Sequence, residues 1–153
     1  MIERVIFLRG GETKPILKKL YSLICIPFLT FKGSYIGSGA KFASTPIFPH
    51  GVTGIFISSG AVIGKDCVIF HQVTIGSDTL KDSSKKGSPV IGNNVYIGAG
   101  AKIIGNVKIG DNCRIGANSV VVKDVPNNTT VVSQPARFII KNTPPSNGFR
   151  KFQ

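Results

Sequence analysis

The segment IGNNVYIGAGAKIIGNVKIGDNCRIGANSVV, which spans Ile91 to Val121, decides how this chain folds. An aliphatic residue returns in it every six positions, and the same period runs through the segment before it. These first-place residues are Ile57, Ile63, Ile69, Ile75, Ile91, Ile97, Ile103, Ile109, Ile115 and Val121. A period of six fits neither an α-helix nor a single strand, but it fits a coil of short strand segments that turns a corner after each unit.

Two other places of the six-residue unit are also restricted. The second place mostly holds a small or turn-prone residue, as a tight corner requires: Ser58, Gly64, Gly76, Gly92, Gly98, Gly110 and Gly116. The fifth place holds Ala61, Cys67, Val73, Val95, Ala101, Val107, Cys113, Ser119 and Val125. Side chains alternate along a strand, so places one and five point the same way, into a continuous core. The pattern therefore predicts an all-β solenoid.

The run from Ile91 to Pro126 resembles the hexapeptide-repeat acyltransferases, and within them the serine acetyltransferases and the related O-acetyltransferases of surface polysaccharides. The resemblance covers roughly Ile36 to Ile140. It implies a left-handed parallel β-helix with three strands per coil, and acyl transfer as the activity. The fold class we expect is all-β, a left-handed parallel β-helix with a short N-terminal helical segment.

We expect the 153 residues to form one domain with three segments. An N-terminal helical cap occupies residues 1–34, and the solenoid occupies residues 35–141. A polar loop insertion interrupts the solenoid at residues 77–89, and a flexible tail follows at residues 142–153.

The N-terminal segment from Pro15 to Phe31 begins like a helix and then becomes almost wholly apolar. Its apolar part is shorter than the about 20 residues that span a bilayer, and the helix-breaking Pro27 interrupts it. We expect a helix that covers the open end of the solenoid or packs in an oligomer. The alternative is an interfacial membrane helix aided by Lys14, Lys18 and Lys19.

A net charge of +12 indicates an anionic partner: a phosphorylated cofactor, an anionic polysaccharide, a membrane surface or nucleic acid. No nucleic-acid partner is expected, because no recognition helix, zinc or aromatic RNA-binding motif accompanies the charge. Cys25, Cys67 and Cys113 are interpreted as small core residues in a reducing compartment. Since Met1 to Gly10 lacks a cleavage site, we expect a cytoplasmic protein, membrane-associated if the N-terminal helix binds a membrane surface.

Counting in units of six places four residues in one row. If three units make one coil, as the resemblance implies, residues one coil apart lie above one another at ~4.8 Å. His50, His71, Ala99 and Ala117 then share the third place and line one outer edge. This holds if the three extra residues beside His50 and the ten extra residues in the loop bulge outward without shifting the register.

His50 is the candidate catalytic residue. Its setting, PHGVTGIFI, resembles the D-H-x-T-G-I-V-V segment that carries the general base in the family, and the solenoid repeat is broken there. An imidazole titrates near neutrality and can take a proton from an acceptor hydroxyl that attacks an acyl thioester. The group that orients His50 is left open between a backbone carbonyl and Asp78.

The remaining site residues are assigned to the cofactor and the acceptor. Small residues in the third place leave a groove for a pantetheine arm, and the resemblance implies that Ala99 and Ala117 contact coenzyme A. The expected acetyl-CoA site consists of Ser77, Gly98, Ala99, Ala117, Lys123 and Arg137, the last two as phosphate partners. His71 and Ser88 are assigned to the acceptor. No metal is expected.

Two departures from serine acetyltransferases shape the predicted function. The aspartate that orients the base falls at Tyr35, and the second active-site histidine falls at Ser88. We therefore expect an acetyl-CoA-dependent O-acetyltransferase acting on a sugar of a surface polysaccharide or its precursor. The resemblance also implies a homotrimer with sites between subunits, which would take a small-molecule or oligosaccharide acceptor.

Several alternatives stay open at this stage. They are serine O-acetylation, N-acetylation of an amino-sugar nucleotide, and a non-catalytic solenoid that works as a binding module. A zinc enzyme of the γ-carbonic anhydrase type needs three histidines per site, whereas this chain has two.

Overall fold

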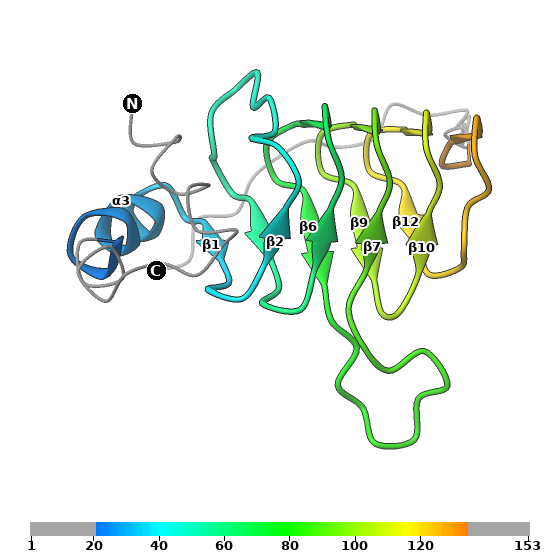
Figure 1. Ribbon diagram of the computed structural model, residues 1–153, viewed down its shortest axis with the longest axis horizontal. Coiled ribbons are helices and arrows are strands. Elements are labelled where there is room, and N and C mark those ends of the chain that lie inside the picture. Colours follow the sequence, from blue (N-terminus) through cyan, green and yellow to red (C-terminus); the bar gives the residue numbers. More distant parts are fainter. Residues whose placement is uncertain (1–20, 135–153) are drawn as a thin grey trace, which may run out of the picture.

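The computed structural model describes residues 21–134, and most of this length winds into a parallel β-helix whose coils stack along one axis (Figure 1). From Phe56 to Val121, successive strands enter three parallel sheets in turn. Sheet A contains β1 (Tyr35–Ile36), β3 (Phe56–Ile57), β6 (Thr74–Gly76), β9 (Lys102–Ile104) and β12 (Val120–Val121). Sheet B contains β2 (Lys41–Phe42), β4 (Val62–Ile63), β7 (Val90–Ile91) and β10 (Lys108–Ile109). Sheet C contains β5 (Val68–Ile69), β8 (Tyr96–Ile97), β11 (Arg114–Ile115) and β13 (Thr130–Val131).

The strand register survives both interruptions of the repeat. Ile57 lies between Ile36 and Ile75 in sheet A, so the three extra residues before β3 leave the ladder in step. Ile63 pairs with Ile91 across the loop insertion. Both insertions therefore bulge outward without shifting the strand register, which is the condition for residues one coil apart to align. The prediction of three strands per coil is confirmed.

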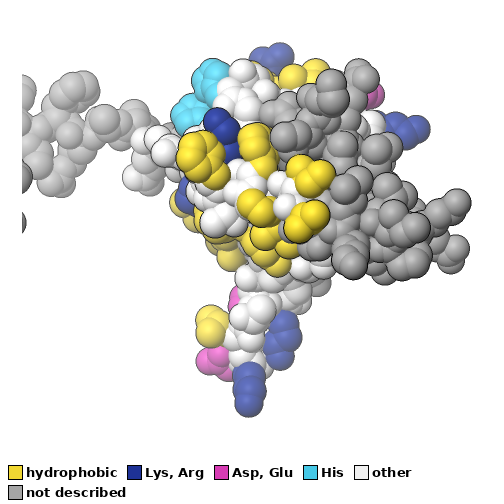
Figure 2. All heavy atoms as spheres, turned by 90° about the vertical axis from the view of Figure 1, so that its left-hand side faces the viewer, with side chains coloured by type: hydrophobic (Ala, Val, Ile, Leu, Met, Phe, Trp, Pro, Cys, Tyr) yellow, Lys and Arg dark blue, Asp and Glu magenta, His cyan; other side chains and the backbone are white. Residues whose placement is uncertain are grey.

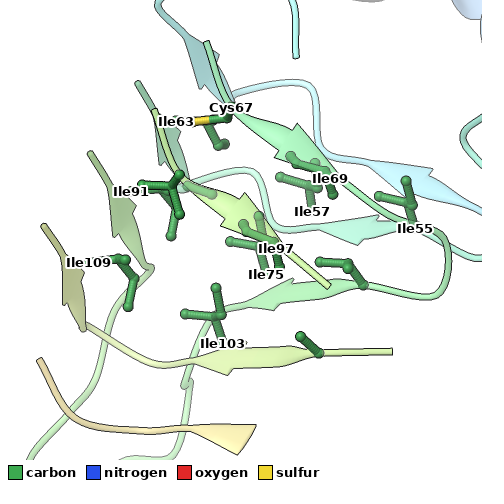
Figure 3. Close-up of a cluster of buried hydrophobic side chains, with 14 of the residues drawn as sticks. Ile55, Ile57, Ile63, Cys67, Ile69, Ile75, Ile91, Ile97, Ile103 and Ile109 are labelled. Carbon is green, nitrogen blue, oxygen red and sulfur yellow. The ribbon is translucent and has the colours of Figure 1, made fainter. Parts of the chain in front are cut away.

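The core is the stack of first-place and fifth-place side chains (Figure 3). The first-place residues from Ile57 to Val121 are at most 5% exposed, and the fifth-place residues are buried as well. Cys25, Cys67 and Cys113 are all buried. Burial raises the pKa of the Cys67 thiol, which keeps it protonated and unreactive, as expected of a small core residue.

The corners between strands need unusual backbone geometry. At Gly98, a Cβ atom would lie 2.7 Å from the backbone nitrogen of Ala117 in the next coil, so only glycine allows the coils to stack this closely. Non-glycine residues with positive φ also occur at corners, and they are Asp66, Gln72, Asn94, Asn112, Asn118 and Asn128. Asparagine and aspartate tolerate this conformation well, which accounts for their recurrence three residues after a residue of the first-place row. Val125, counted as a fifth-place residue in the sequence, belongs to that row because it pairs with Ile109.

A helical segment lies at the N-terminal end of the solenoid (Figure 1). A π-helical turn, η1 (Tyr21–Cys25), runs into α3 (Ile26–Phe31), and Cys25 and Leu29 are buried in the same cluster as the solenoid core. Pro27 is the second residue of α3 and follows directly after the point where the π-helical turn gives way to the α-helix.

The described residues contain no helix that is both long and apolar enough to cross a membrane. The expected start of the N-terminal helix, from Pro15 to Leu20, lies outside the described residues, as does the tail at residues 142–153.

Candidate active site

The four third-place residues share one edge of the solenoid, where the chain passes from sheet C to sheet A. The backbone N–H of Gly100 donates to the carbonyl of His71 (3.0 Å), and that of Asn118 donates to the carbonyl of Ala99 (2.9 Å). His71, Ala99 and Ala117 therefore stack coil upon coil, as the sequence predicted. We call this corner, residues 49–54, 70–73, 98–101 and 116–119, the histidine edge.

The three extra residues beside His50 change which residue continues the backbone ladder. Thr53, rather than His50, accepts the N–H of Gln72 (2.9 Å). His50 is thus displaced outward from the ladder and its side chain is exposed, whereas the side chain of His71 is half-buried. The break in the repeat frees one imidazole from the packing of the coil.

The two imidazole rings are in direct contact. Nδ1 of His50 lies 2.8 Å from Nδ1 of His71, and the ring centroids are 4.7 Å apart with the planes inclined by 41°. The His50 ring also meets Phe70 nearly edge to face, at a centroid distance of 5.2 Å. Phe70 in turn lies 5.1 Å from the ring of Tyr96. His50 is therefore held by an aromatic contact on one side and a ring nitrogen on the other.

The sequence left the orienting group of His50 open, and neither candidate is the group in contact. Asp78 is committed within the loop, where its carboxylate accepts the N–H of Leu80 (3.0 Å) and the hydroxyl of Ser83. The Ser83 hydrogen bond and then the Leu80 one lower the pKa of Asp78. The partner of His50 is His71, which the sequence assigned to the acceptor. The shared row was the available signal, but it does not reveal ring contact.

The cofactor candidates on the histidine edge differ in accessibility. Ala117 is exposed and Ala99 is half-buried, so both small side chains border open surface. Gly98 is buried against the next coil, and this close stacking by itself explains why a glycine is needed there. The glycine is therefore no separate evidence for contact with a cofactor.

Sequence reasoning missed one charged group on this edge. The ammonium of Lys102 donates to the carbonyls of Gln72 (2.8 Å) and Gly100 (2.9 Å). These two hydrogen bonds tie two coils together. The sequence shows only an outward-facing lysine in a strand. Its position at the corner becomes visible once the coils are stacked.

Ser77 and Ser88 lie at a different corner, between sheets A and B. Their hydroxyls are 2.7 Å apart and join the two ends of the loop insertion, where Asp78 and Gly87 also form a pair of backbone hydrogen bonds (2.9 and 3.0 Å). The loop and the two histidines lie on opposite sides of the solenoid (Figures 1 and 2). One chain therefore does not bring Ser77 or Ser88 to His50.

The two predicted phosphate partners are not on the histidine edge either. Lys123 follows β12, beside Asp124, whose carboxylate meets the Lys85 ammonium of the loop at 3.5 Å. It thus belongs to the corner that carries the loop. Arg137 lies outside the described residues.

A coil of six-residue units that enters three parallel sheets defines a hexapeptide-type β-solenoid, and this one carries both of its histidines on one edge. Residues 88–123 match the family described as bacterial transferase hexapeptide (six repeats). A serine acetyltransferase of Synechococcus elongatus is 44% identical over 72% of this chain and 44% of its own length. One from Buchnera aphidicola subsp. Schizaphis graminum is 47% identical over 71% of this chain and 41% of its own length.

Solved structures agree with the sequence relatives. The serine acetyltransferase of Neisseria gonorrhoeae superposes with a TM-score of 0.66 at 38% identity, over 78% of this chain and 47% of that one. The soybean apoenzyme gives a TM-score of 0.66 at 36% identity, over 90% of this chain and 54% of that one. Residues 88–123 of this chain carry the repeat of that hexapeptide transferase family, and the fold of the chain is the left-handed parallel β-helix. It spans about half the length of the curated relatives it matches.

Proposed function

We propose that this protein is an acetyl-CoA-dependent O-acetyltransferase with His50 as its general base. The observation that carries the proposal is the exposed His50 ring, held by His71 on the edge that also presents Ala99 and Ala117. Relatives described as serine acetyltransferases support the same chemistry. Because the chain spans about half of their length, the activity is inferred from the site together with the resemblance.

The geometry suits transfer to a hydroxyl group. A hydroxyl is a weak nucleophile until a base removes its proton, and the exposed imidazole of His50 is placed to do this. The small side chains of Ala99 and Ala117 leave room for a pantetheine arm along the edge. A backbone N–H at the corner would stabilise the oxyanion that forms when the hydroxyl attacks the thioester carbon.

We propose serine as the first acceptor to test. The relatives and solved structures named here are serine acetyltransferases, and none supports the polysaccharide acceptor that the sequence analysis preferred. Tyr35 and Ser88 stand where the resemblance implies an aspartate and a second histidine. A carbohydrate hydroxyl is therefore kept as the competing acceptor in the experiment.

We also propose that the working unit is a homotrimer with its sites between subunits. In one chain the histidines lie opposite the loop insertion (Figure 2). Ser88 and Lys123 belong to the corner that carries this loop, so they can reach His50 only from a second copy. Large apolar side chains on the outer strand faces, such as Tyr35, Phe56 and Tyr96, remain about half exposed in the single chain and would gain from burial. We place the protein in the cytoplasm, where acetyl-CoA is available.

The test is acceptor-dependent thiol release from acetyl-CoA. Serine, simple sugars, amino sugars, nucleotide sugars and oligosaccharides are compared with a reaction that lacks acceptor, and coenzyme A binding is measured by calorimetry. Turnover with serine or a sugar hydroxyl would support O-acetylation and identify the acceptor class. Turnover with amines alone would overturn O-acetylation and indicate N-acetylation. No turnover with retained coenzyme A binding overturns the proposal in favour of a binding module.

A further inference from the structure

The His50 and His71 contact determines where the protons of the two rings must be. A neutral imidazole has one N–H and one nitrogen with a lone pair. Two Nδ1 atoms at 2.8 Å form a hydrogen bond only if one of them donates and the other accepts. Two arrangements are possible, and they leave opposite nitrogens available for chemistry.

We infer that His71 is a positioning residue that accepts the Nδ1–H of His50, an inference that rests on the proposed function. In this arrangement, Nε2 of His50 keeps its lone pair and is free to act as a base. In the reverse arrangement, the Nε2 of His50 carries the proton and cannot take another from the acceptor. The pair is thus a histidine version of the oriented base in which a carboxylate usually accepts the Nδ1–H.

The surroundings of the two rings are unequal and favour this direction. His71 is half-buried, and its carbonyl belongs to the backbone ladder, which makes it the better-fixed partner. His50 is exposed and displaced from that ladder, as a base that meets a soluble acceptor must be.

The proton accounting of one turnover follows directly. The acceptor oxygen forms a bond to the acyl carbon as its proton moves to Nε2 of His50, and the carbon–sulfur bond then breaks. The proton passes from Nε2 to the departing sulfur, which releases coenzyme A as the thiol. Throughout, the Nδ1–H of His50 stays bonded to Nδ1 of His71, so the transient imidazolium is stabilised without a second proton transfer.

Kinetics of two matched variants test the role of His71. His71→Gln supplies an amide oxygen that can accept the Nδ1–H, whereas His71→Leu fills similar space without an acceptor. We expect His71→Leu to lose about 10- to 100-fold in kcat, the usual cost of removing a partner that orients a functional histidine, with little change in KM for acetyl-CoA. His71→Gln should recover most of that loss. Equal kcat values for the two variants, both folded by thermal melting, would overturn the inference.

Nitrogen-15 NMR of the imidazoles gives a readout that does not need turnover. The chain has two histidines, so spectra of the untagged parent, His50→Ala and His71→Gln assign every ring nitrogen. We expect His50 as the Nδ1–H tautomer and His71 as the Nε2–H tautomer in the parent, with the His50 tautomer kept in His71→Gln and lost in His71→Leu. The opposite tautomers, or freely exchanging rings, would refute the pairing even in an active enzyme. The expected tautomers in a protein without transferase activity would refute the proposed function instead.

Discussion

Two edges of the same solenoid share one backbone geometry but carry different side chains. At the corner between sheets B and C, which we call the asparagine edge, side-chain amides stack as a ladder: Asn94 donates to Asn112 (2.9 Å) and Asn112 donates to Asn128 (3.1 Å). At the histidine edge, the stacked residues above His71 are alanines, which make no side-chain hydrogen bonds. One edge is tied together by its own side chains, whereas the other presents small side chains and an exposed imidazole.

The difference shows how a repeat protein separates stability from function. Residues one coil apart lie ~4.8 Å apart, close enough for amides to bond one another in continuous rows. Polar groups used in this way are not available to a ligand. The histidine edge has small residues and a three-residue break instead, and this is where the exposed imidazole lies.

The largest expected effect is on the histidine edge. His50→Ala should lose about 10²- to 10⁴-fold in turnover, the usual contribution of a positioned general base, while it retains coenzyme A binding. The measurement is acetyl transfer to the best acceptor of the screen, after circular dichroism shows equal folding. Full activity in this variant would move the chemistry away from the histidine edge.

The matching change on the asparagine edge should affect stability instead. Asn112→Ala removes two amide hydrogen bonds and places alanine at a φ of 56°, which asparagine tolerates better. We expect the free energy of unfolding to fall by about 2 kcal/mol, measured by denaturant titration, with kcat unchanged at a temperature where the variant is folded. A large loss of activity in the folded variant would mean that the two edges are not separable.

A bulky residue on the proposed cofactor path should produce a smaller and more selective effect. Ala117 is exposed, so Ala117→Phe should leave the core intact but obstruct the path proposed for the pantetheine arm. We expect coenzyme A to bind about tenfold more weakly, a change of about 1.4 kcal/mol in calorimetry. Unchanged affinity would remove Ala117 from the groove, and a loss of thermal stability would place its side chain in the packing.

The smallest effect concerns the core beneath the asparagine edge. Burial raises the pKa of Cys67 in the folded protein, while the thiol of an unfolded chain titrates at about 8.5. This contribution to stability is complete below that value, and it is lost as the pH rises further because the unfolded state alone releases the proton. The stability of Cys67→Ala should therefore decline less steeply than that of the parent above pH 9. Parallel declines would show that this thiol contributes nothing to the alkaline loss.

Much of the fold could be predicted because the repeat constrains it so heavily. The burial of Ile57 through Val121 and the stacking of His71 on Ala99 both follow from counting in sixes. The turn residues with positive φ, such as Asn94 and Asn112, are visible in the sequence once the corners are known, but the sequence analysis did not use them.

The site was only partly predictable. The sequence placed His50 on the correct edge, but Thr53 takes the place in the backbone ladder that counting gave to His50. Ser88 was grouped with the site through the resemblance, but in one chain it lies at another corner and bonds Ser77. Matching a sequence motif identifies residues, but it does not show at which of the three corners of the coil those residues lie.

The sequence alone determined the coil, its core and its register, because a six-residue period satisfies burial and backbone hydrogen bonding in a single way across stacked strands. Only the tertiary structure decided that the imidazoles of His50 and His71 meet at their Nδ1 atoms. That contact joins residues 21 positions apart across a three-residue bulge, so it depends on side-chain direction and on the path of the bulge. Neither is encoded in a periodic pattern, because a period specifies which residues align and leaves open how far each one extends from the ladder.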